Sequence, residues 1–250
     1  YADAAADDEG ASEYFLALGR RVCGWLDDAG FPYCRGEIMA QNPRWSRPLS
    51  TWRGYFSEWI RSAEPMEVLE FTAFFDFRSV HGDRALADAL LEHVFAEAQA
   101  HHAFFVQLAE HVQRFKPPMR LFGRIIAGGA GGQETQMLNV KDAMAPLIGF
   151  ARVYSLRERI EETSTLERLQ ALSEAGELAD AGRDETVAAF TNLMRLRLEG
   201  QASALEAEKE PDNLVAYRDL TDVQRTLVNQ AFAQIAAVQN RVSHDFLGNT

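Results

Sequence analysis

The chain has 250 residues, of which 47% are hydrophobic, and a formal net charge of −12 at pH 7. This is enough apolar material for one large domain or two small ones, whereas the acidity excludes nucleic acid and anionic membranes as expected partners, because both require a basic surface. Cys23 and Cys34 lack the spacing of metal ligands, and so few thiols are typical of a reducing compartment. With no stretch near the length of a membrane span, about 20 apolar residues, we expect a cytoplasmic protein.

Two amphipathic helices are predicted in the first quarter of the chain. Ser12 can cap the first and Gly30 can end it. Its apolar residues recur with the helical period and predict one buried face: Phe15, Leu18, Val22, Trp25, Leu26 and Ala29. The second helix carries an aromatic stripe of Trp52, Tyr55, Phe56, Trp59 and Ile60. Core packing is the favoured interpretation of this stripe. The same stripe could instead face a second subunit, so a homodimer remains an alternative.

A short aromatic run at residues 71–78 predicts a buried strand, because β-favouring residues are followed by a turn signal at residues 81–83. Side chains alternate along a strand, so Asp76 and Arg78 would share one face. A carboxylate on a buried strand costs several kcal/mol unless it is paired, hydrogen-bonded or bound to a metal. Two hypotheses explain Asp76: it takes part in chemistry, or it forms a structural salt bridge with Arg78.

The next segments predict a long helical region and a β-hairpin. Asp83 can cap the helical region, and Pro117-Pro118 ends it. Residues 121–127 and 133–141 read as two strands joined by a glycine-rich tip at residues 128–132.

Everything from Pro146 onward is predicted to be helical. Pro146 suits a first helical position, and Ser164 and Thr221 each begin a capping-box pattern. The apolar seam of the last helix is typical of an antiparallel bundle. It consists of Val228, Ala231, Ile235, Val238 and Val242. The predicted fold class is therefore α+β but mostly α, with an α/β piece over residues 1–82 and a helical bundle over residues 83–250.

Arginines interrupt two apolar helical stretches, at Arg152 and at Arg195 and Arg197. A charged side chain on or beside an apolar face needs a partner, so each arginine either pairs with an acid or binds an anion. Both alternatives stay open from the residues alone.

Eight segments, in order along nearly the whole chain, resemble one family: the nucleotidyltransferases of bacterial signalling proteins that carry a substrate-binding domain, often beside cyclic-nucleotide-binding and CBS domains. They are similar to the uridylyltransferase that modifies the PII nitrogen-signalling protein. The segments are Gly30-Phe31-Pro32-Tyr33-Cys34, residues 39–45, Phe74-Phe75-Asp76-Phe77-Arg78, His81-Gly82-Asp83, Asn139-Val140-Lys141, residues 164–169, residues 196–201 and Pro211-Asp212-Asn213.

The resemblance implies a polymerase-β-like nucleotidyltransferase domain, of which residues 1–82 would be the last part, followed by a helical substrate-binding domain. It implies transfer of a nucleoside monophosphate from an NTP to a protein acceptor with Mg²⁺ as cofactor, since the ion offsets charge on the leaving pyrophosphate. Asp76 would be a catalytic, metal-binding carboxylate. By charge and position, the expected nucleotide or substrate contacts are Arg78, Lys141, Arg152 and Arg197.

The chain departs from the family pattern in one respect. It contains no Gly-Ser turn followed by an Asp-x-Asp strand. By the family layout both would lie upstream of Tyr1, so we expect these 250 residues to be inactive alone. The alternative hypothesis is a non-catalytic regulatory module that binds a partner protein or a small effector.

Overall fold

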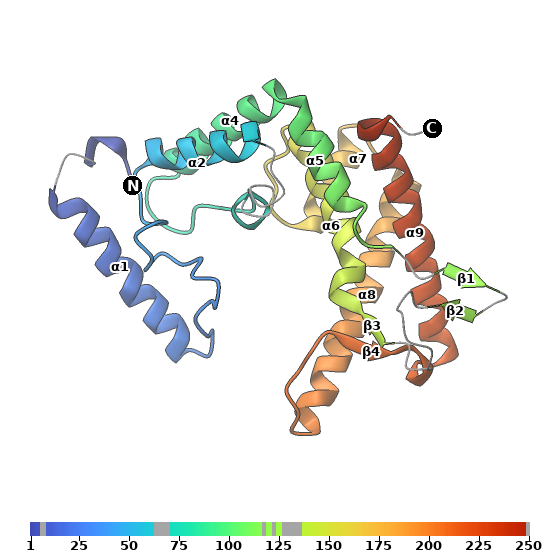
Figure 1. The fold of residues 1–250 in the computed structure, drawn as a ribbon. Coiled ribbons are helices and arrows are strands. Elements are labelled where there is room, and N and C mark those ends of the chain that lie inside the picture. The colour runs from blue at the N-terminus through green and yellow to red at the C-terminus, as the bar shows by residue number, and fades with distance from the viewer. Residues whose placement is uncertain (6–8, 63–70, 117–118, 122–123, 127–136, 249–250) are drawn as a thin grey trace. The chain divides into compact units, whose positions relative to one another are not determined.

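The computed structural model describes residues 1–5, 9–62, 71–116, 119–121, 124–126 and 137–248. It confirms the predicted class, mostly α with a little antiparallel β structure (Figure 1). The chain divides into two compact units, Tyr1–His101 and His102–Thr250. The sequence predicted a domain boundary between residues 82 and 83. In the structure the helix at Ala85–Ala100 belongs to the first unit, which ends at His101.

The first unit contains η1 (Asp3–Ala5), α1 (Glu9–Asp28), α2 (Leu49–Ser62) and α4 (Ala85–Ala100). Helices α2 and α4 pack against each other. The predicted continuous helix after Asp83 is interrupted at His101, where the φ of −126° and ψ of 80° are not helical. Among the described residues of this unit there is no strand.

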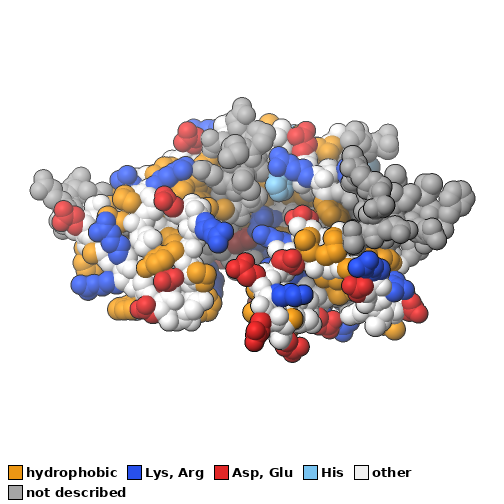
Figure 2. Space-filling model, turned by 60° about the horizontal axis from the view of Figure 1, so that its bottom comes forward, with side chains coloured by type: hydrophobic (Ala, Val, Ile, Leu, Met, Phe, Trp, Pro, Cys, Tyr) orange, Lys and Arg blue, Asp and Glu red, His pale blue; other side chains and the backbone are white. Residues whose placement is uncertain are grey.

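Helix α1 forms as predicted, but the side on which it packs differs from the predicted one. Except for the half-buried Phe15, the apolar residues expected in the core are exposed, and Figure 2 shows hydrophobic side chains on the surface of this unit. They include Leu18, Val22, Trp25 and Leu26. The buried side carries Ala11, Gly19 and Cys23 instead. A Cβ on Gly19 would lie 2.4 Å from the carbonyl oxygen of Ala40, so the missing side chain permits a close approach of backbone.

We therefore expect Gly19→Ala to destabilise the first unit by about 1–3 kcal/mol, because the clash is with backbone that cannot rotate away. Gly54→Ala on α2 is the matched control, since nothing lies within 4 Å of its added Cβ. This control should stabilise the protein by up to about 1 kcal/mol through helix propensity. Urea unfolding followed by circular dichroism measures both, and equal midpoints for the two variants would contradict the close approach.

The prediction of a strand at residues 71–78 is wrong. Residues 71–74 are helical, and residues 75 and 76 form a turn. The N–H of Phe75 donates to the carbonyl oxygen of Phe71 at 2.8 Å, and the two rings stack at 5.1 Å on one buried side. A strand requires a hydrogen-bonded neighbour, and the described part of this unit offers none. The aromatic residues are buried equally well by the helical turn.

An aromatic core holds the first unit together. Trp59 and Phe56 from α2 are almost fully buried, and their rings meet edge to face at 5.1 Å. Phe74 stacks on Trp59 at 5.7 Å and lies 4.4 Å from the ring of Trp45. The interpretation of the aromatic stripe on α2 as core is therefore confirmed for Phe56, Trp59 and Ile60, whereas Trp52 and Tyr55 are half-buried.

The second unit is a helical bundle with two short antiparallel ribbons. Its elements are α5 (His102–Val112), β1 (Met119–Leu121), β2 (Arg124–Ile126), β3 (Met137–Asn139), α6 (Val140–Arg157), α7 (Thr165–Glu174), α8 (Asp180–Glu206), β4 (Leu214–Ala216), η2 (Tyr217–Asp219) and α9 (Asp222–Leu247). Helix α6 contacts α5, α7, α8 and α9, so it lies at the centre of the bundle (Figure 1).

Among the described residues, the strands near residues 121–141 do not pair with each other as predicted, and residues 122–123, 127 and 133–136 of the predicted strands lie outside the described part of the chain. β2 pairs with β1, and β3 pairs with β4, which comes 75 residues later in the chain. Helix α6 begins at Val140, so β3 is only three residues long and Pro146 lies inside the helix, not at its first position. The glycine-rich segment at 128–132 lies outside the described residues. Strand β4 was missed because its three residues are too few to produce a pattern.

The last helix agrees with the sequence in detail. All five predicted seam residues of α9 are buried. Thr221 and Gln224 form the predicted capping box, whereas Ser164 precedes α7 without a side-chain capping bond. Within the described residues, no helix is both long and apolar enough to cross a membrane.

Candidate functional site at the β3–β4 corner

Three segments that carry the family resemblance meet where β3 pairs with β4. Asn139 ends β3, and its side-chain oxygen caps α6 by accepting from the Asp142 N–H at 3.3 Å. The N–H of Val140 donates to the carbonyl oxygen of Asn213 at 2.9 Å. The corner therefore joins the start of α6 to the residues that precede β4.

Arg197 completes this corner from helix α8. Its Nε donates to the Oδ1 of Asn213 at 2.7 Å, and its side chain is half-buried. No carboxylate of a described residue lies within 4.0 Å of its charged nitrogens. A guanidinium that is partly desolvated and held by a neutral amide retains donors for an anion.

Lys141 belongs to the same corner, since it follows Val140 directly in the first turn of α6 and is exposed. The first turn of a helix carries a partial positive charge, and the basic residue adds to it, although Asp142 in the same turn reduces the effect. The structure thus brings Lys141 and Arg197, 56 positions apart in sequence, to one corner. Their chemistry suits a phosphate or a carboxylate.

The other basic residues lie elsewhere. Arg152 is half-buried in α6, eleven residues beyond Lys141, a separation of about 16 Å along a helix. Arg195 is exposed and lies 3.7 Å from Glu199 on the same helix, which is an ordinary surface ion pair. Arg78 is exposed in the first unit, and no ion pair joins it to Asp76.

Asp76 is half-buried in the turn after the helical residues 71–74. Its Oδ1 is shielded from solvent. A magnesium site in proteins takes several oxygen ligands, usually from more than one carboxylate. In the described part of the chain there is no group of three or more His, Cys, Asp or Glu residues able to hold a metal ion. The described residues alone do not fit a complete magnesium site.

Sequence reasoning missed the role of Asn213. The segment Pro211-Asp212-Asn213 contributed to the resemblance, but no function was attached to it. The available signal was Arg197 itself, since a half-buried guanidinium needs an acceptor and a neutral amide is one way to supply it. Only the pairing of β3 with β4 places that amide beside the arginine.

Two models of known protein families match the chain. Residues 102–246 match the model described as "Putative nucleotidyltransferase substrate binding domain", which covers more than half of the chain. The chain belongs to this family. Residues 1–66 match a second model, described as "Putative nucleotidyltransferase DUF294". No curated protein and no solved structure matches the chain. The family match covers nearly all of the second unit, which contains the β3–β4 corner.

Proposed function

We propose that this chain is the acceptor-binding portion of a signalling enzyme that transfers a nucleoside monophosphate from an NTP to a protein. The β3–β4 corner carries the proposal. There Arg197 is held by Asn213 next to the basic first turn of α6, in the unit that matches a nucleotidyltransferase substrate-binding domain. A corner of this kind would hold the phosphates of the nucleotide or an acidic group of the acceptor.

In this proposal the first unit contributes Asp76 as one metal-binding carboxylate, with Arg78 near it in sequence. Magnesium, when bound, would offset charge on the departing pyrophosphate. Further carboxylates are required, because the 250 residues contain no Asp-x-Asp strand. Arg152 would act as a substrate contact apart from the corner. The 250 residues by themselves are proposed to be inactive.

The test uses protein expressed from the complete reading frame, incubated with magnesium and α-labelled ATP or UTP in a nucleotide-depleted extract of the source cells. We expect label to appear on a protein, and to disappear with Asp76→Ala. Arg197→Gln should lower labelling about tenfold to a hundredfold, which is the worth of a charged hydrogen bond. The matched control is Arg218→Gln, an exposed arginine whose replacement should leave labelling unchanged.

Full labelling in the Asp76→Ala variant would remove this residue from the catalytic set. The second candidate function, a non-catalytic regulatory module, is favoured by the absence of companion carboxylates among the described residues. It predicts no labelling with either nucleotide. Calorimetry with NTP and magnesium would then show whether Arg197→Gln changes binding of the nucleotide as an effector.

A further inference from the structure

A groove runs between helices α8 and α9 on the second unit, and its narrow end includes Leu196 and Glu199, which flank Arg197 in sequence. The two helices are antiparallel, since Thr186 faces Gln234 and Glu199 faces Gln224. The groove has a volume of about 460 Å³, within the range of binding sites for small molecules and short peptide segments. We call it the amide groove, and its lining includes Glu185, Ala188 and Asn192 of α8 and Gln230, Ala233 and Gln234 of α9.

Primary amides from both helices line the groove. Gln234 is fixed, because its Nε2 donates to the Oγ1 of Thr186 at 2.8 Å, and Thr186 in turn donates to the carbonyl oxygen of Gly182 at 2.7 Å. The side-chain amides of Asn192 and Gln230 have no hydrogen-bond partner among the described residues. Each amide offers an acceptor and two donors, so the groove suits a ligand that alternates donors and acceptors.

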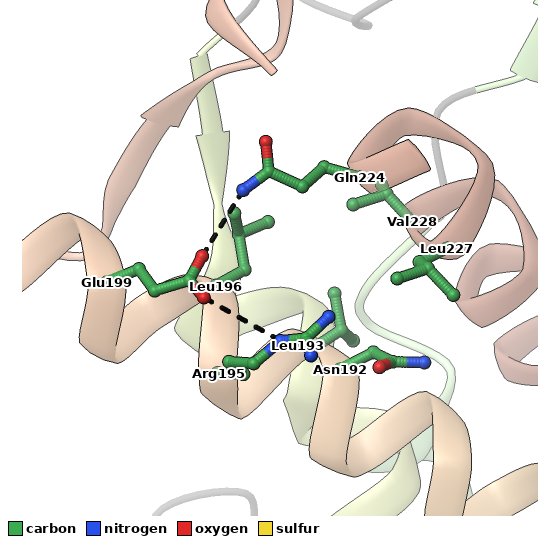
Figure 3. A pocket seen from close by; sticks show the side chains of 8 residues that line it. All are labelled: Asn192, Leu193, Arg195, Leu196, Glu199, Gln224, Leu227 and Val228. Atoms are coloured by element: carbon green, nitrogen blue, oxygen red, sulfur yellow. Dashed lines mark hydrogen bonds and ion pairs between the residues drawn. The ribbon is translucent and has the colours of Figure 1, made fainter. Parts of the chain in front are cut away.

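One end of the groove is narrow and closed by charged side chains. Figure 3 shows Glu199 between Arg195 and Gln224, which it contacts at 3.7 and 3.2 Å. The narrow end shares Asn192 and Leu227 with the wide end, so the two form one continuous depression. The wide end extends from Glu185 to Asn192 along α8, about 10 Å, which is the length of about three extended residues.

The residues that line the groove favour a peptide over a nucleotide as its ligand. A nucleobase would need an aromatic side chain to stack on, and none is present among the described residues that line the groove. Phosphates would meet the carboxylate of Glu185 at one end, and at the other end the charge of Arg195 is balanced by Glu199. The buried alanines Ala189 and Ala231 leave room for backbone to approach the floor. A peptide main chain supplies the required donors and acceptors.

We propose that the amide groove binds an extended peptide segment, with small residues over its alanine floor and a basic residue toward Glu185. This rests on the proposed function, in which the acceptor is a protein, and identifies the groove as the place where a segment of that acceptor lies. Peptides held mainly through main-chain hydrogen bonds derive specificity from alternate side chains, and we expect weak affinity, with Kd of about 1 mM.

The test is NMR titration of the ¹⁵N-labelled 250-residue chain with the peptide acetyl-Lys-Ala-Ser-Ala-Lys-amide. The side-chain amide signals of Asn192, Gln230 and Gln234 are expected to shift and to saturate. The amide of Gln239 serves as an internal control, because it is buried and donates to the carbonyl oxygens of Val112 and Phe115. Its signal should remain in place.

Two matched variants locate the binding site. Ala233→Trp fills the groove from an exposed position and should abolish the shifts. Ala236 is also exposed on α9 but does not line the groove, so Ala236→Trp should leave the shifts unchanged. An unaltered spectrum elsewhere in each variant shows that it is folded. The proposal is overturned if the three amide signals do not move with peptide, if Ala233→Trp binds as well as the parent, or if adenosine or uridine shifts them and the peptide does not. Because no nucleotide transfer is measured, failure here is distinct from failure of the labelling assay.

Discussion

Trp59→Ala is expected to lower the free energy of unfolding of the first unit by about 3–5 kcal/mol, the usual cost of deleting a large buried aromatic side chain. Trp59 is 2% exposed and contacts the rings of Phe56 and Phe74. Removing it deletes three ring pairs, with Tyr55, Phe56 and Phe74, and leaves a cavity at the junction of α2 with residues 71–75. Urea unfolding followed by circular dichroism measures the loss.

Trp25→Ala provides a control with the same change in side-chain volume. Trp25 lies on the outward face of α1 and is 65% exposed, so its removal should change stability by no more than about 0.5 kcal/mol. A loss for Trp25→Ala as large as that for Trp59→Ala would show that the outward face of α1 is covered in solution.

The second large loss of stability is expected when Tyr154 in α6 is replaced by phenylalanine. This residue is 1% exposed, and its hydroxyl donates to the Oδ2 of Asp245 in α9 at 2.5 Å. The guanidinium of Arg157 lies 4.6 Å from the centre of the tyrosine ring, and that of Arg241 lies 4.9 Å from it. Tyr154→Phe removes a hydrogen bond to a charged group, and we expect a loss of about 1.5–3 kcal/mol in urea unfolding.

Tyr217→Phe is the matched control for this substitution. The Tyr217 hydroxyl donates to the neutral amide of Asn229 over 3.3 Å, so its loss should cost no more than about 1 kcal/mol. Equal losses for the two Tyr→Phe variants would contradict a special contribution from the Tyr154 hydrogen bond.

The same cluster predicts a pH dependence. Burial alone would raise the pKa of the Asp245 carboxyl. Hydrogen bonds from His244 and Tyr154 lower this pKa, as do the positive charges of Arg241 and Arg157. Together they outweigh burial, so the pKa lies below its usual value of 3.8. The ionised carboxylate therefore stabilises the fold above the usual pKa, and this stabilisation is lost as the pH falls through the lowered value. Burial, with the bond to Asp245, raises the pKa of Tyr154, which stays protonated.

Asp245→Asn should thus make the free energy of unfolding less dependent on pH under acidic conditions. The difference in unfolding free energy between parent and variant is expected to shrink as the pH is lowered below about 4. Urea midpoints measured from pH 7 down to pH 2.5 test this, and a difference that stays constant over that range would show that Asp245 does not titrate with folding.

Local patterns in the sequence were sufficient for most helices. The apolar seam of α9 and its Thr221 capping box were predicted residue by residue, because both depend on interactions within one or two turns. For α1 the helix was predicted but not its buried face. The apolar side carries Trp25 and Leu26, yet the side with Gly19 packs inward, because a close backbone approach requires the absence of a side chain.

The sequence by itself determined that this protein is mostly helical and which family it resembles. Only the tertiary structure decided the conformation of residues 71–78 and the pairing of β3 with β4. The physical reason is that a strand is stabilised by hydrogen bonds to a partner that can come from anywhere in the chain, whereas a helix satisfies its own backbone. For the same reason the contact between Arg197 and Asn213 is visible only in the folded chain, since it depends on that pairing.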